Sequence, residues 1–154
     1  IEFSQKDIEF SISPAASIED NYNNLYADVG LWVENGYIDA VIPQLYFGFE
    51  YPIEEYRFEN LLVSWKKLAA CNDEVELLIG LANYKIGTDS EPDKAEWKSN
   101  NDIIARQVEI CYKDDRVTGY IFFSFSSLFS NDEQNIKQRE AVLKILNNSE
   151  ENYG

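Results

Sequence analysis

The chain has 154 residues, among them 13 Lys or Arg, 28 Asp or Glu and no His, which gives a formal net charge of −15. Without His, a Ser-His-Asp triad, a Cys-His pair and an HExxH zinc site are excluded. The charge also argues against a nucleic-acid partner, because phosphate backbones bind Lys and Arg, whereas the apolar fraction of 45% predicts a folded core.

In the first half of the chain, a short β-rich run is twice followed by a stretch with helical periodicity. The first strand is expected at residues 8–13, ended by Pro14, and the first helix at about 23–35. The second strand is expected at 38–46, and a second helix at about 54–71. The aromatic run after this strand is expected to be mainly a packed loop.

The second half repeats the pattern. The third strand is expected at 75–82, followed by a polar loop at 87–99 and a helix that carries Ile104, Val108 and Cys111 on one face. The fourth and most aromatic strand is expected at 119–125 and the last helix at about 132–146.

Strands that alternate with helices predict an α/β fold of four βα units around a parallel sheet. Two architectures remain, an open doubly wound sheet and half of a (β/α)8 TIM barrel, since a whole barrel needs roughly 250 residues. Length alone favours the open sheet, because it needs no missing half. Residues 1–154 are treated as a single domain fragment, with the βα units at about 8–146 and a polar tail at 147–154.

In parallel αβ folds, functional side chains gather where the strands end. Alternation on the fourth strand is expected to place Tyr120, Phe122 and Ser124 on that side of the sheet, and Phe123 toward the helices. Buried polar groups need partners, which a hydroxyl-rich sugar supplies, and aromatic faces suit its ring. A carbohydrate ligand is therefore expected, and the candidate substrate-binding residues are Ser13, Gln44, Tyr46, Tyr84 and Ser124. The alternative is that these groups satisfy one another at a crowded strand end.

None of the four expected strands ends in Asp or Glu, although glycoside hydrolysis ordinarily uses two carboxylates, so the catalytic residues stay unassigned. The acidic run 89–93 lacks the central Gly and final Glu of a calcium loop, and we expect neither a metal nor a cofactor. Cys71 and Cys111 are expected to be free, partly buried thiols, with a disulfide between them as the alternative.

No run of about 18 apolar residues predicts a membrane span, and the start of the chain has no signal-peptide pattern. The chain begins at Ile1 and contains no Met, so we expect it to be a piece of a longer protein.

Several blocks of the sequence resemble the bacterial glycosyl hydrolase-like family 10, in the family's order, over about residues 9–129. The blocks that carry the resemblance are Phe10–Pro14, Leu25–Val29, Trp32–Tyr46, Leu78–Ile86 and Gly119–Ser124. Members of this family carry a TIM-barrel domain, often in secreted or lipoprotein-type envelope proteins. The resemblance implies that the chain is the C-terminal half of that barrel, with the family's acidic strand end upstream of Ile1. Phe47 and Asn83 depart from the family pattern.

The resemblance implies that the parent is a glycoside hydrolase that acts on a polysaccharide or cell-wall glycan, located outside the cell or in the bacterial envelope. The isolated chain is then expected to be inactive. The alternative is a non-catalytic carbohydrate-binding or protein-interaction module, because a fold does not determine a function. A half-barrel also leaves its first and last strands with unpaired edges, which predicts a homodimer through those edges.

Overall fold

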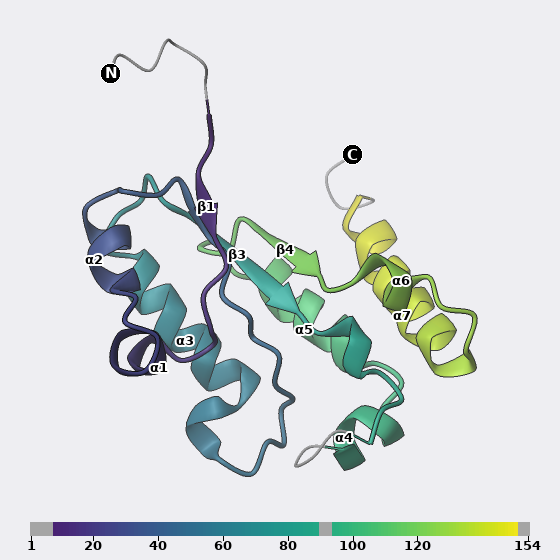
Figure 1. Ribbon diagram of the computed structural model, residues 1–154. Coiled ribbons are helices and arrows are strands. Elements are labelled where there is room, and N and C mark those ends of the chain that lie inside the picture. Colours follow the sequence, from purple (N-terminus) through teal and green to yellow (C-terminus); the bar gives the residue numbers. More distant parts are fainter. Residues whose placement is uncertain (1–7, 90–93, 151–154) are drawn as a thin grey trace.

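The computed structural model describes residues 8–89 and 94–150. Four parallel strands form one sheet in the order β1-β2-β3-β4, with β1 and β4 at its two edges (Figure 1). The strands are β1 (Ser11–Ile12), β2 (Ala40–Val41), β3 (Glu76–Leu81) and β4 (Gly119–Phe122). This arrangement confirms the expected α/β fold. The sheet does not close on itself within the described part of the chain, as expected for half of a TIM barrel.

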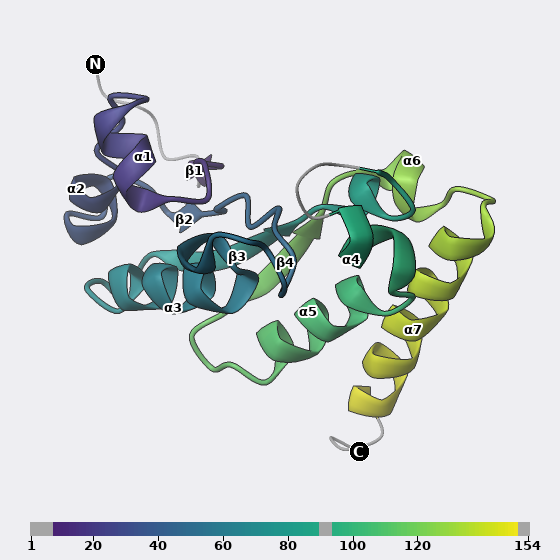
Figure 2. The same cartoon turned by 90° about the horizontal axis from the view of Figure 1, so that it is seen from below.

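The helices α3 and α5 lie along the same side of the sheet (Figure 2), α2 packs on α3, and α7 packs on α5. The α-helices are α1 (Ile18–Asn23), α2 (Val29–Glu34), α3 (Phe58–Ala69), α4 (Lys94–Ser99), α5 (Ile103–Tyr112), α6 (Phe125–Leu128) and α7 (Glu133–Glu150). There are also two 3-10 helices among the described residues: η1 (Glu54–Tyr56) precedes α3, and η2 (Asn83–Lys85) follows β3. Of the expected polar tail, residues 147–150 continue α7, and 151–154 lie outside the described residues. No described helix has the length and apolar character needed to cross a bilayer.

The single helix expected at about 23–35 is wrong, because α1 ends at Asn23 and α2 begins only at Val29. Ser17 caps α1 by accepting a hydrogen bond from the amide of Asp20 at 3.1 Å, and Asp28 caps α2 by accepting one from the amide of Leu31 at 3.0 Å. Between them Tyr26 has φ 54°, in the left-handed region that does not continue a helix. The two caps thus interrupt the apolar spacing that favoured one continuous helix.

The expected second strand is longer than the one observed. Only Ala40–Val41 joins the regular ladder, and Gln44 returns to β3 as an isolated bridge opposite Gly80. Pro43 has no amide hydrogen to donate, and its carbonyl accepts from the amide of Gly80 at 3.0 Å. Two further segments differ from expectation: α4 occupies the end of the expected polar loop, and α6 follows directly after β4.

The face assignment is correct for β3 and wrong for β4. Leu77, Ile79 and Leu81 are buried on the helix side, as expected. On β4, Tyr120 and Phe122 pack against the same core, whereas Ile121 lies opposite Gly80 and is 42% exposed. The period of two holds, but the phase is reversed, because pairing with β3 sets which residues of β4 face the helices.

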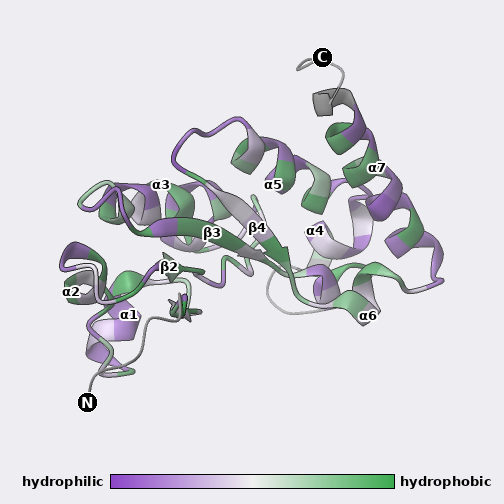
Figure 3. Ribbon diagram, turned by 90° about the horizontal axis from the view of Figure 1, so that it is seen from above, coloured by the Kyte–Doolittle hydropathy of each residue, from purple (hydrophilic) through white to green (hydrophobic). Residues whose placement is uncertain are grey.

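The core lies between β3 and the helices that cover it, and apolar residues follow one another along β3 (Figure 3). Trp65 of α3 is fully buried, and its indole Nε1 donates to the carbonyl of Ala16 at 2.6 Å, which ties α3 to the segment after β1. Both cysteines are free. Cys111 is buried, and Cys71, expected to be partly buried, is exposed at the end of α3.

Candidate functional site

A cavity of about 310 Å³ opens beside the carboxyl ends of the strands, and Gln44, Tyr46 and Tyr84 of the expected set line it. Gln44 and Tyr46 follow β2, and Tyr84 belongs to η2 after β3. The remaining lining residues come from the segment after β1, α1, the loop after β2, η1 and η2: Ala15, Ala16, Ser17, Asp20, Phe47, Tyr56 and Lys85. Side chains from three consecutive strand ends therefore meet at one site, as the parallel topology predicts.

Tyr46 and Tyr84 of the cavity lining are in contact with the ring of Phe123, which itself lies outside the lining. The ring of Phe123 is stacked on that of Tyr46 with 6.0 Å between centroids, and Tyr84 stands edge-on to both, at 5.9 Å from Tyr46 and 6.0 Å from Phe123. Burial, and then the proximity of Tyr84, raise the pKa of Tyr46. Phe123 was not among the expected site residues, because alternation on the fourth strand predicted that it faces the helices, the opposite of the observed phase.

Ser13 and Ser124 lie outside the residues that line the cavity. Ser13 contributes its backbone, since its carbonyl accepts a hydrogen bond from Nε2 of Gln44 at 3.0 Å. Ser124 precedes α6, and its hydroxyl lies 3.0 Å from that of Ser126 and 3.5 Å from that of Ser127. The structure therefore brings together three of the five expected side chains.

A second aromatic group forms the rim of the cavity on the loop after β2. The ring of Phe47 lies 4.8 Å from that of Tyr51 and 5.3 Å from that of Tyr56, between centroids. Tyr56 donates its hydroxyl to Oδ2 of Asp20 at 2.6 Å, and this hydrogen bond is the main cause of its raised pKa. Asp20 is the one carboxylate among the described residues that line the cavity, and it is held by this contact.

Glu96 of α4 holds the loop after β2 by accepting hydrogen bonds from its backbone amides. Its side chain is 4% exposed, and its two carboxylate oxygens accept the amides of Phe49 at 2.8 Å and Glu50 at 3.0 Å. Nε2 of Gln107 donates to the carbonyl of Phe47 at 2.9 Å, so α5 holds the same loop. We call these hydrogen bonds of Glu96 and Gln107 to the loop the clamp. The only sequence signal for the clamp is Gly48, which interrupts the aromatic run.

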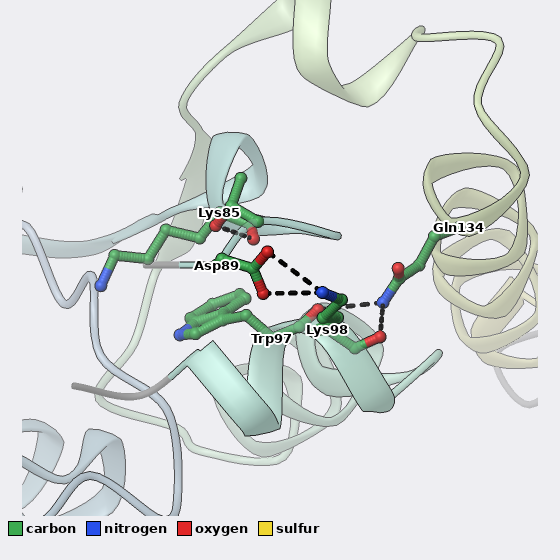
Figure 4. A network of polar contacts seen from close by, with 6 residues as sticks. Lys85, Asp89, Trp97, Lys98 and Gln134 are labelled. Carbon is green, nitrogen blue, oxygen red and sulfur yellow. Dashed lines mark hydrogen bonds and ion pairs between the residues drawn. The ribbon is translucent and has the colours of Figure 1, made fainter. Parts of the chain in front are cut away.

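A polar network ties the segment after η2 to the C-terminal helix (Figure 4). Nζ of Lys98 is paired with Asp89 at 2.8 Å, and Nε2 of Gln134 donates to the carbonyls of Trp97 and Lys98, both at 2.9 Å. The Nζ atom of Lys85 lies 5.7 Å from the ring centroid of Trp97. Because α4 belongs to this network, the clamp on the aromatic loop is supported from α7.

A larger groove of about 1030 Å³ lies between the helices α1, α2 and α3, and it shares Ala16, Ser17, Asp20 and Tyr56 with the smaller cavity. Its acidic lining residues are Glu19, Asp20, Asp28, Glu34 and Glu55, and Lys67 lies among them. We assign the site to the smaller cavity, because parallel αβ folds place their chemistry at strand ends. No group of three or more His, Cys, Asp or Glu residues able to hold a metal ion occurs among residues 8–89 and 94–150.

The chain matches the family described as Glycosyl hydrolase-like 10 over residues 3–99. It is 32% identical over 111 residues to glycosyl hydrolase YngK of Bacillus subtilis (strain 168), which covers 72% of this chain and 20% of that protein. It is 28% identical over 134 residues to glycosyl hydrolase DigH of Escherichia coli (strain K12), which covers 75% of this chain and 29% of that protein. The chain thus spans less than a third of the length of either relative. With a fold that agrees with half of a TIM barrel, this chain belongs to the glycosyl hydrolase-like 10 family.

Proposed function

We propose that this chain is the C-terminal half-barrel of a glycoside hydrolase that acts on a polysaccharide or cell-wall glycan. Membership of the family and its relatives YngK and DigH, both named glycosyl hydrolases, support the reaction class. The observation that carries the proposal for this chain is the strand-end cavity, where the amide of Gln44 lies among the rings of Tyr46 and Tyr84. An amide and phenol hydroxyls can bond sugar hydroxyls while the rings cover apolar C–H groups.

In this proposal the chain binds and orients the glycan, and the catalytic pair of carboxylates comes from another part of the protein. Glycoside hydrolysis needs two carboxyl groups about 5–9.5 Å apart. Asp20, the one carboxylate that the described cavity lining provides, is already bonded to Tyr56. The isolated chain therefore binds glycan without cleaving it.

The test compares the 154-residue chain with the polypeptide that its whole gene encodes. Both are incubated with purified cell-wall glycan strands and with soluble polysaccharides, and released reducing ends are measured. We expect activity from the longer polypeptide only, lowered by Gln44→Ala and by Tyr84→Ala. Cleavage by the isolated chain, or no cleavage by either, would contradict the proposal.

A carbohydrate-binding module without catalysis is the second candidate, and the single engaged carboxylate in the cavity favours it. This function predicts that the longer polypeptide retains glycans on an array and releases no product from them. Release of product by the longer polypeptide would contradict this second function and support the hydrolase.

The proposal includes an extracellular or envelope location, with a lipoprotein-type anchor on the parent, for which the resemblance to family members is the support. Fractionation of cells that express the whole gene tests it. Recovery of the protein in the cytoplasmic fraction would contradict this location.

We also propose that the isolated chain forms a homodimer through its strand edges. The edge strands β1 and β4 each have a neighbour on one side only within the described residues (Figure 1), and unpaired edges favour pairing with another chain. Two copies related by a twofold axis would set each β1 edge against the other copy's β4 edge. Light scattering should give the mass of a dimer, and a monomer at micromolar concentration would contradict the proposal.

A further inference from the structure

We infer that Gln107 of α5 is a positioning residue, which holds Phe47 and the loop after β2 in the conformation that binds the glycan. This inference rests on the proposed function and adds to it a residue that does not touch the sugar. Gln107 is fully buried and lies outside the cavity lining, but its Nε2 atom donates to the carbonyl of Phe47 at 2.9 Å. Because Phe47 lines the cavity, this hydrogen bond fixes the backbone of a residue that borders the ligand.

The loop is held along its length by groups from outside it. The carbonyl of Gly48 accepts from the amide of Phe58 at 3.0 Å, and the carbonyl of Tyr51 accepts from Nε of Arg57 at 3.1 Å. Together with the clamp, these bonds give each of the residues 47–51 a backbone partner outside the loop. A loop that is already ordered loses little conformational entropy when a ligand binds, which favours affinity.

The bonding of Gln107 indicates that its amide serves the loop rather than the stability of the core. Its Oε1 atom is buried and has no hydrogen-bond partner within the described residues. Such an acceptor costs free energy, so an apolar side chain of the same size would suit the interior as well. Within residues 8–89 and 94–150, the bond to Phe47 is the one hydrogen bond that this side chain makes.

Gln138 of α7 is a matched comparison, because it is also a buried Gln that bonds to backbone groups. Its Oε1 atom accepts from the amide of Ile104 at 3.1 Å, and its Nε2 atom donates to the carbonyl of Asn100 at 3.1 Å. Both ends of this amide are therefore satisfied, and neither bond reaches the loop after β2. Its loss should lower stability and leave the site unchanged, since Val108 still anchors α5 in the core.

The test measures binding of chitohexaose and cellohexaose to the full chain by calorimetry, and stability by urea unfolding, for Gln107→Met and Gln138→Met. Methionine is unbranched like Gln and has no amide donor. We expect Gln107→Met to weaken binding by about tenfold, through a less favourable entropy, because the ligand must then order the loop. Its stability should change little, since removal of the unpartnered acceptor offsets the lost hydrogen bond. Gln138→Met should show the opposite result, lower stability with unchanged affinity.

Hydrogen exchange of the ligand-free chain provides a second measurement. In Gln107→Met we expect the amides of Phe49 and Glu50 to exchange several-fold faster than in the unmodified chain, because their loop has lost one of its anchors. The amides of β3 should exchange at unchanged rates. Addition of the oligosaccharide should restore the protection of the loop.

Unchanged affinity of Gln107→Met, while Gln44→Ala still weakens binding, would overturn this inference alone. An equal loss of affinity in Gln107→Met and Gln138→Met would also overturn it, because a general effect on packing would then explain both. Failure of Gln107→Met to fold would contradict it as well, since the inference requires a nearly unchanged stability. No binding of either oligosaccharide by the unmodified chain would overturn the proposed function, and this inference with it.

Discussion

Glu96 occupies the space into which a side chain on Gly48 would project. A Cβ atom added to Gly48 would lie 1.9 Å from Oε2 of Glu96, far inside van der Waals contact. The same carboxylate accepts two backbone amides of the loop after β2, and the rim of the cavity belongs to that loop. A helix that begins almost fifty residues later thus determines the path of the loop that borders the site.

Gly48→Ala should therefore destabilise the fold. The added methyl group displaces the carboxylate from the amides of Phe49 and Glu50, which breaks two partly buried charge-assisted hydrogen bonds, at a cost of about 2 kcal/mol. Urea unfolding measures the change. In a Glu96→Ala background the same substitution should cost little, because the obstructing carboxylate is gone, and an undiminished cost there would refute this explanation.

Glu96→Gln tests the charge of the clamp without removing its volume. The amide can accept one of the two backbone hydrogens and must turn its own NH2 group toward the other, so we expect a loss of about 1–3 kcal/mol in the free energy of unfolding. Glu109→Gln is the control, because Glu109 pairs with Lys113 on the surface of α5 and its loss should cost about 0.5 kcal/mol or less. Equal effects of the two substitutions would show that the buried carboxylate has no special role.

Arg116 connects the end of α3 to the start of β3, on the side opposite the site. Its Nη2 atom donates to the carbonyls of Ala69, Asn72 and Val75. Carbonyls at a helix end have no partner within the helix, so Arg116→Ala should lower the free energy of unfolding by about 2 kcal/mol. Glycan binding by the variant at low temperature should stay unchanged, and a selective loss of binding would contradict this structural role.

Burial, and then the nearby Asp114, raise the pKa of the Cys111 thiol from 9.0 to about 12. The folded state therefore disfavours the thiolate, whereas the unfolded chain ionises near pH 9. The contribution of this thiol to the free energy of unfolding is therefore fully present below pH 9. Between pH 9 and 12 it decreases by up to about 1.4 kcal/mol per pH unit. Urea unfolding between pH 8 and 10 measures this slope, below the range in which the tyrosines contribute strongly.

Cys111→Ala should flatten this pH dependence while lowering stability at pH 7 through the cavity it leaves. Cys71→Ala removes the exposed thiol, and this variant should show the same slope of stability against pH as the unmodified chain. In the native state we also expect one thiol, that of Cys71, to react with a thiol reagent at pH 8, and both to react after unfolding. A slope that persists in Cys111→Ala would assign the alkaline loss of stability to other groups.

Hydrophobic periodicity was sufficient to predict four βα units, the parallel sheet and the helix-facing side of β3. These features depend on residues close together in the chain, since Leu77, Ile79 and Leu81 alternate within one strand. The same reasoning placed Gln44, Tyr46 and Tyr84 at neighbouring strand ends, and all three line one cavity. Whether they bind a glycan stays a prediction.

The phase of β4 and the clamp on the aromatic loop depend instead on tertiary structure. Alternation along β4 allowed two phases, and only its pairing with β3, which sets Ile121 opposite Gly80, selected the one that leaves the ring of Phe123 against Tyr46. Glu96 contacts Phe49 and Glu50, which precede it in the chain by 47 and 46 positions. Local spacing contains no signal for contacts between residues so far apart. Local patterns thus determined the order of the four strands and of the main helices between them. Packing decided which side chains reach the site, because register and burial arise from distant segments that meet only in the folded chain.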